Sequence, residues 1–176
     1  IIDGGIFNAA SISARSFEAD SIGVHIGSGA TTPQIVNNGA IFATVNTETT
    51  HSAYGVRIDA GANVASVTNN GLIQSDVRGF DGDVIGFQDL SGTVTTFLNT
   101  SRINTGYTDD DPDDNILSGN GRAIALDLSH SASNVTLTQT DTIDNARIAG
   151  DVLFGVGNDT FNLLSGEVLG NVEFGT

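Results

Sequence analysis

Cysteine, tryptophan, methionine and lysine are all absent from the 176 residues, and aromatic residues make up only 6% of them. Without cysteine the chain has no disulfide framework, no thiolate metal site and no cysteine nucleophile. With so few aromatic residues we expect no thick globular core. Hydrophobic residues nevertheless amount to 39% and are mostly Ile, Val, Leu and Ala, which favours thin stacked layers of strands.

Positive charge is also scarce. The chain has six arginines and 21 acidic residues, which gives a net charge of −15. A field of that sign repels phosphate backbones and anionic lipid, so we expect no nucleic-acid partner. The sequence has no run of 18 apolar residues, and we expect no direct membrane insertion of this segment. Because Ile1 and Thr176 both lie in mid-pattern, we expect a piece of a longer protein with open, adhesive ends.

The main feature that is present is a repeat. Residues 23–26, Gly-Val-His-Ile, match residues 55–58, Gly-Val-Arg-Ile, and residues 35–41 match residues 67–73 at the same offset of 32. Apolar and polar residues alternate within the repeats, which indicates strands with one buried face. Short strands at a fixed period bury that face only when successive turns stack. We therefore predict an all-β fold, a right-handed parallel β-helix with coils of about 20–32 residues.

The centre of the repeat reads apolar-x-Asn, followed by small or polar residues and then Ile. It recurs at spacings of 29, 32, 30 and 46 around five asparagines: Asn8, Asn37, Asn69, Asn99 and, in degraded form, Asn145. The long last step contains five aspartates within residues 109–114. A single acidic loop inserted in a regular array of five turns explains that step.

The last part of the chain has a shorter period. Residues 150–155 match residues 170–175 at an offset of 20, which is close to the smallest coil that three short strands allow. We predict one β-helix over the whole chain, divided into regular repeats (1–105), the acidic insertion (106–120) and further coils (121–176).

The aligned asparagines have a structural explanation. An amide at the same position of every coil hydrogen-bonds to the amides above and below it, as in cross-β stacks. Asparagine and glycine also tolerate the left-handed backbone of a corner. We predict a corner ladder made by five residues: Asn37, Asn69, Asn99, Gly39 and Gly71.

These coils resemble the β-helical passenger regions of autotransporters and related large bacterial surface proteins. The resemblance rests on the Gly-Val-x-Ile and Val-x-Asn-x-Gly-x-Ile patterns and on residues 154–160, Phe-Gly-Val-Gly-Asn-Asp-Thr. It implies secretion to the bacterial cell surface by an outer-membrane β-barrel of the same parent chain. The implied partners are a host or neighbouring-cell surface, or like subunits stacked end to end.

Two acidic features are candidates for calcium, the one cofactor that we consider. Residues 155–161 approach the Gly-Gly-x-Gly-x-Asp calcium repeat, with Asp159 as the ligand, although the first glycine is replaced by Phe154. The acidic run contributes Asp109, Asp111 and Asp113. The alternatives are a carboxylate that caps a turn and a hydrated loop.

No arrangement predicts catalysis. Asp127, Ser129 and His130 are the types of a nucleophile triad, but sequence neighbours on a strand point to opposite faces, so we expect no triad there. We predict a non-enzymatic structural or adhesive stalk. A head-to-tail surface filament is one alternative, and a carbohydrate-active β-helix, either a lyase or tailspike-like, is another.

Overall fold

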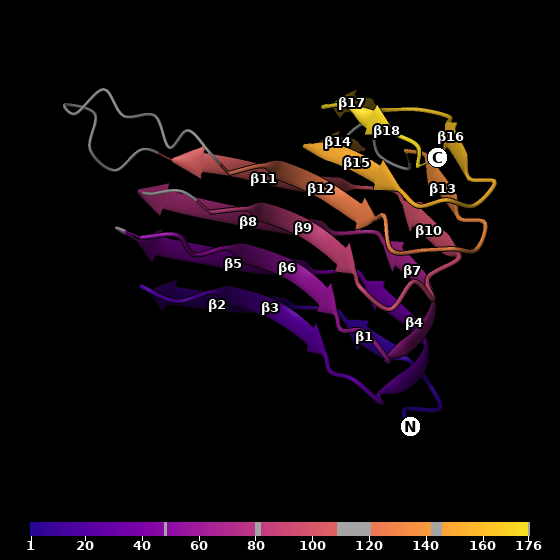
Figure 1. Ribbon diagram of the computed structural model, residues 1–176, viewed down its shortest axis with the longest axis horizontal. Coiled ribbons are helices and arrows are strands. Elements are labelled where there is room, and N and C mark those ends of the chain that lie inside the picture. Colours follow the sequence, from indigo (N-terminus) through magenta and orange to yellow (C-terminus); the bar gives the residue numbers. More distant parts are fainter. Residues whose placement is uncertain (48, 80–81, 109–120, 142–145, 176) are drawn as a thin grey trace.

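The computed structural model of the chain describes residues 1–47, 49–79, 82–108, 121–141 and 146–175. Within them it contains eighteen β-strands and no helix, and the strands form three parallel sheets of six (Figure 1). Successive strands belong to successive sheets, so each group of three forms one coil, from coil 1 (β1–β3) to coil 6 (β16–β18). The predicted parallel β-helix is confirmed.

The three sheets are named here in the order in which the chain visits them. Sheet A contains β1 (Ile6–Asn8), β4 (Thr31–Asn37), β7 (Asn63–Asn69), β10 (Thr96–Asn99), β13 (Thr136–Gln139) and β16 (Thr160–Leu163). Sheet B contains β2 (Ser11–Phe17), β5 (Ala40–Thr47), β8 (Leu72–Gly79), β11 (Arg102–Thr108), β14 (Arg147–Ala149) and β17 (Glu167–Leu169). Sheet C contains β3 (Ser21–Ile26), β6 (Ala53–Ile58), β9 (Val84–Asp89), β12 (Ala123–Leu128), β15 (Asp151–Phe154) and β18 (Val172–Glu173).

The coils vary in length. Stacked residues of sheet A are 29, 32, 30, 40 and 24 positions apart from one coil to the next. The last step in sheet C is 20 residues, as the match between residues 150–155 and 170–175 predicts.

One part of the predicted register is wrong. Gln139 occupies the position on Asn99 that was predicted for Asn145, so that step is 40 residues and not 46. In sheet B, Arg147 stacks on Arg102. The extra length is therefore divided between two places, the acidic segment after β11 and the connection between β13 and β14. The acidic aspartates and Asn145 themselves lie outside the described residues.

The core has two parts. The larger cluster contains apolar residues of all three sheets, including Ile41, Phe87 and Phe97, and the last two rings meet edge to face at 5.0 Å. The smaller cluster lies between sheets B and C only, and contains Ala43, Val45, Ala53, Val77 and Val84. We call this part of coils 1–4, where the end of each sheet B strand packs against the start of the sheet C strand that follows it, the wing. In Figure 1 it is where the strands of sheet B extend to one side and those of sheet C return.

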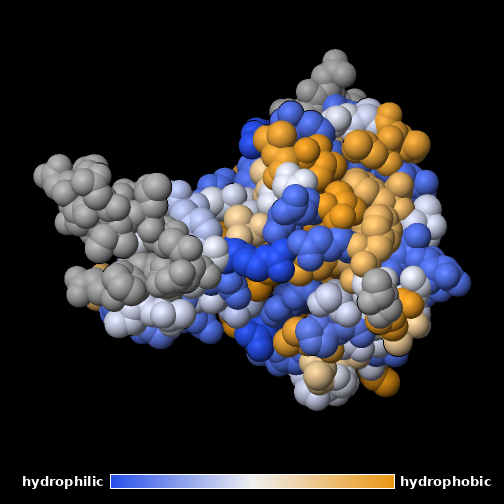
Figure 2. Space-filling view, turned by 45° about the horizontal axis from the view of Figure 1, so that its top comes forward, coloured by the Kyte–Doolittle hydropathy of each residue, from blue (hydrophilic) through white to orange (hydrophobic). Residues whose placement is uncertain are grey.

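Coils 5 and 6 have no wing. Their sheet B strands have three residues each, whereas β5 and β8 have eight. Apolar side chains gather in the upper right part of Figure 2, where Figure 1 places these coils, and the exposed ones include Leu163, Leu164 and Phe174. At the other end of the solenoid Phe7 and Phe17 are exposed. Both end coils thus present apolar surface.

Candidate functional site

The corner between sheets A and B holds a column of buried amides. Asn37 Nδ2 donates to Asn69 Oδ1 at 2.8 Å, and Asn69 Nδ2 donates to Asn99 Oδ1 at 2.8 Å. Asn8 begins the column and Gln139 continues it, with distances of 2.7 and 2.9 Å to their neighbours. The register that the 32-residue offset predicts for Asn37 and Asn69 is the one observed.

Each amide also binds backbone. The second hydrogen of Asn37 Nδ2 is donated to Leu72 O, that of Asn69 Nδ2 to Arg102 O, and Gln139 Nε2 donates to Glu167 O. Asn69, Asn99 and Gln139 are fully buried. Since burial of an amide is tolerated only when its hydrogen bonds are made, this ladder fixes the register of five coils.

The predicted role of backbone conformation at this corner is wrong. Neither Asn37 nor Asn69 has a positive φ, and neither does Gly39 or Gly71. A Cβ on Gly71 would instead lie 1.9 Å from Gly39 O. Glycine is therefore required by the close approach of stacked backbones, and not by a left-handed turn.

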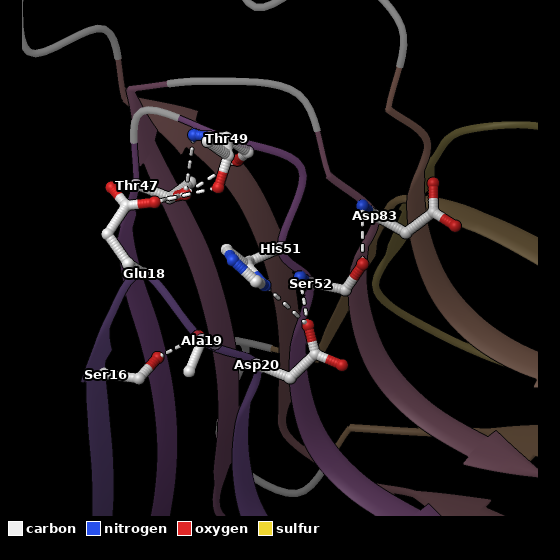
Figure 3. Close-up of polar contacts among 9 residues, drawn as sticks. All are labelled: Ser16, Glu18, Ala19, Asp20, Thr47, Thr49, His51, Ser52 and Asp83. Carbon is white, nitrogen blue, oxygen red and sulfur yellow. Dashed lines mark hydrogen bonds and ion pairs between the residues drawn. The ribbon is translucent and has the colours of Figure 1, made fainter.

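A second ladder, which the sequence analysis missed, lies at the tip of the wing (Figure 3). Asp20 Oδ1 accepts a hydrogen bond from Ser52 N at 2.9 Å, Ser52 Oγ accepts one from Asp83 N at 3.0 Å, and Asp83 Oδ1 accepts one from Arg122 N at 2.9 Å. Each side chain thus caps the backbone of the next coil. The signal was present as a polar residue immediately before each strand of sheet C in coils 1–4.

Next to that ladder lies the one described non-glycine residue with a positive φ, Glu18 at 54°. Its carboxylate accepts a hydrogen bond from Thr49 Oγ1 at 2.8 Å, and Thr47 Oγ1 lies 3.2 Å from the same oxygen (Figure 3). Ser16 Oγ donates to Ala19 O across the turn. The strained residue is held by contacts to the neighbouring coil, so this cluster also serves to stack coils.

A row of ion pairs joins coils 4, 5 and 6. Arg122 Nη2 lies 2.7 Å from Asp151 Oδ2 and 2.9 Å from Glu173 Oε1. Partial burial acts to raise the pKa of Asp151, but hydrogen bonds from Arg122 and from Asn171 N outweigh it and hold the pKa below its ordinary value. The same contact with Asp151 raises the pKa of Arg122.

No family model, no curated protein and no solved structure matches this chain. In the described part of the chain, no helix has the length and apolar character needed to cross a membrane.

Of the calcium candidates, Asp159 is the one that lies in the described part of the chain. Asp159 Oδ1 accepts a hydrogen bond from Val135 N at 2.7 Å, so this carboxylate binds the backbone of the preceding coil. Asp109, Asp111 and Asp113 lie outside the described residues. Among the residues that are described, no three His, Cys, Asp or Glu side chains form a group suited to a metal ion.

Asp127, Ser129 and His130 do come together, contrary to the expectation from strand geometry, because the chain leaves β12 at Leu128. Ser129 Oγ lies 2.6 Å from Asp127 Oδ1 and 3.5 Å from His130 Nδ1. The order is nevertheless unlike that of a catalytic triad, in which histidine stands between the acid and the nucleophile. Here the serine hydroxyl donates to the aspartate, and no carboxylate of the described residues pairs with the imidazole.

Proposed function

We propose that this chain is a non-enzymatic structural segment, a rigid β-helical stalk exposed on a bacterial cell surface. The observation that carries the proposal is the continuous amide ladder from Asn8 to Gln139, which ties five coils in one register. A stalk needs length and stiffness, and both follow from a repeated pairing whose polar side chains are engaged in holding coils together.

The polar clusters of the chain support the same proposal. At the wing tip Asp20, Ser52 and Asp83 cap the backbone of the next coil, and near the C-terminal end Asp159 caps the backbone of the preceding coil. Residues that bear chemistry in enzymes are here used to satisfy backbone groups.

The stalk is favoured over a filament of like subunits stacked end to end. The amide column starts with Asn8 in coil 1, but its position in coil 6 is occupied by Leu163. Head-to-tail stacking in this register would place a leucine against an asparagine amide. A polar group that meets an apolar one in a buried interface loses its hydrogen bonds to water without compensation.

Removal of one coil tests the stalk. Deletion of residues 38–69 joins Asn37 to Asn70 and keeps every ladder in register, with Asn37 stacking on Asn99. We expect circular dichroism of a folded β-protein and a rod that is shorter by about 4.8 Å in small-angle scattering. The expected release of reducing ends from polygalacturonate is nil for both the parent chain and the deletion variant.

The control is deletion of residues 38–68, which removes one residue fewer. It leaves one extra residue in the corner between sheets A and B, where a Cβ on Gly39 or Gly71 would already meet the backbone of the neighbouring coil, and should prevent folding. If the 32-residue deletion unfolds as the control does, the coils are not interchangeable spacers and the stalk is rejected. Measurable cleavage of the polysaccharide would reject it as well.

A further inference from the structure

The positive charge of this acidic protein is concentrated on one surface. Alternate residues of the sheet B strands point away from the core, as the burial patterns of β2, β5 and β8 show. Of the six arginines, four occupy such outward positions: Arg15, Arg78, Arg102 and Arg147. Only Asp76 and Glu167 are acidic at the outward positions of the described strands of this sheet.

Most of these guanidinium groups have no anionic partner. Among the described residues, the side chains of Arg15, Arg78 and Arg102 make no ion pair or hydrogen bond, and Arg147 Nε lies 3.6 Å from Glu167 Oε1. Arg102 and Arg147 are paired in register, so two like charges face each other across one strand spacing, about 4.8 Å. Such a pair is destabilising unless an anion lies between the charges.

Unsatisfied polar atoms gather on the same surface. Seven buried side-chain nitrogen or oxygen atoms of the described residues have no hydrogen-bond partner, and four belong to outward positions of sheet B: Asn46 Oδ1, Arg78 Nε, Asn104 Oδ1 and Arg147 Nε. Two are donors and two are acceptors. A buried polar atom without a partner is unfavourable, so these four side chains gain when they turn toward a ligand on this face.

We propose that the outer face of sheet B binds an anionic polysaccharide. Arginine pairs in a bidentate manner with carboxylate or sulfate, which accounts for the donors. Sugar hydroxyls supply donors to the amide oxygens of Asn46 and Asn104 once these side chains turn outward, and a carboxylate or sulfate group alone supplies none. The inference goes beyond the stalk, because a stalk need not bind any ligand.

Calorimetric titration of the full 176-residue chain tests the inference, with polygalacturonate as the carboxylated probe and heparin as the sulfated probe. We expect at least one of them to bind, and the double variant Arg102→Gln/Arg147→Gln to bind at least tenfold more weakly. The probe that binds more tightly identifies the anionic group. Neutral dextran should not bind.

The matched control is Arg57→Gln, which removes a positive charge from sheet C, where Arg57 pairs with Asp59. It should leave the Kd unchanged within twofold, and thermal unfolding of each variant shows that it is folded. The inference is overturned if neither polyanion binds at millimolar sugar, if Arg57→Gln weakens binding as much as the double variant, or if single-stranded DNA binds as tightly as the polysaccharide. None of these results affects the stalk, which the coil deletions test.

Discussion

Coils 1–4 and coils 5–6 share one topology but are held together differently. The column of buried amides runs through coils 2–5, but the second apolar cluster between sheets B and C belongs to the wing of coils 1–4. In coils 5 and 6 the sheet B strands have three residues, and the contacts to coil 4 include the half-exposed side chain of Arg122. Stacked pairing alone therefore does not make all coils equally stable. Water and salt weaken exposed ion pairs, but they have little effect on buried hydrogen bonds.

The largest effect should follow from removal of one amide from the column at the corner between sheets A and B. Asn69→Leu keeps the volume but leaves Asn37 Nδ2, Asn99 Oδ1 and Arg102 O without their partner. Each buried polar group that loses its hydrogen-bond partner costs about 1–3 kcal/mol. We therefore expect the free energy of unfolding to fall by about 4 kcal/mol. Urea unfolding followed by circular dichroism measures it.

The neighbouring asparagine provides the control. Asn70 also stacks in a column, with Asn38 and Thr100, but it is exposed. Asn70→Ala should cost less than about 1 kcal/mol, since water replaces the lost bonds. Equal losses for the two variants would mean that burial does not make the amide column stronger than the exposed column of Asn38, Asn70 and Thr100.

A smaller loss is expected from a single methyl group at the corner. In Gly71→Ala the new Cβ would meet Gly39 O at 1.9 Å, and backbone must move to accommodate it. We expect a loss of about 1–3 kcal/mol in urea unfolding, the usual range for overpacking. Gly27→Ala is the comparison, because no atom lies within 4 Å of the added Cβ. An unchanged midpoint for Gly71→Ala would show that the coils are less tightly stacked than the geometry requires.

The smallest effect concerns the ion pairs of coils 5 and 6 and depends on pH. The pKa of Asp151 is lower in the folded state than its ordinary value of 3.8, so its contribution is present at neutral pH and lost as the pH falls through the depressed value. We expect Arg122→Gln to cost about 0.5 kcal/mol at pH 7, since the pair is partly exposed, and the difference from the parent chain to vanish near pH 2.

Arg15→Gln is the control for that titration, because Arg15 has no partner among the described residues. Its urea midpoint should differ from that of the parent chain by the same small amount at both pH values. A loss for Arg122→Gln that persists unchanged in acid would mean that its packing, and not its charge pairs, joins coils 4 to 6.

Several features could be predicted from the sequence because they repeat along it. The parallel β-helix and the stacking of Asn37, Asn69 and Asn99 follow from a period that returns the same side chain to the same place in each coil. Gln139 was missed because it carries the same amide on a longer side chain, so a pattern written for asparagine passes over it. The wing-tip ladder was missed because its positions share polarity and not residue type.

The sequence by itself determined that the strands stack and that Asn37, Asn69 and Asn99 share one column, since both depend on local alternation and on a regular period. Only the tertiary structure decided why Gly39 and Gly71 are glycines, because the atoms that exclude a Cβ belong to the preceding coil. It also decided that Ala43 and Val77 meet Ala53 and Val84 in a second core, and that arginines from four coils share one face. These contacts are made by residues far apart in the chain, and a local sequence pattern does not show how close such residues lie in space.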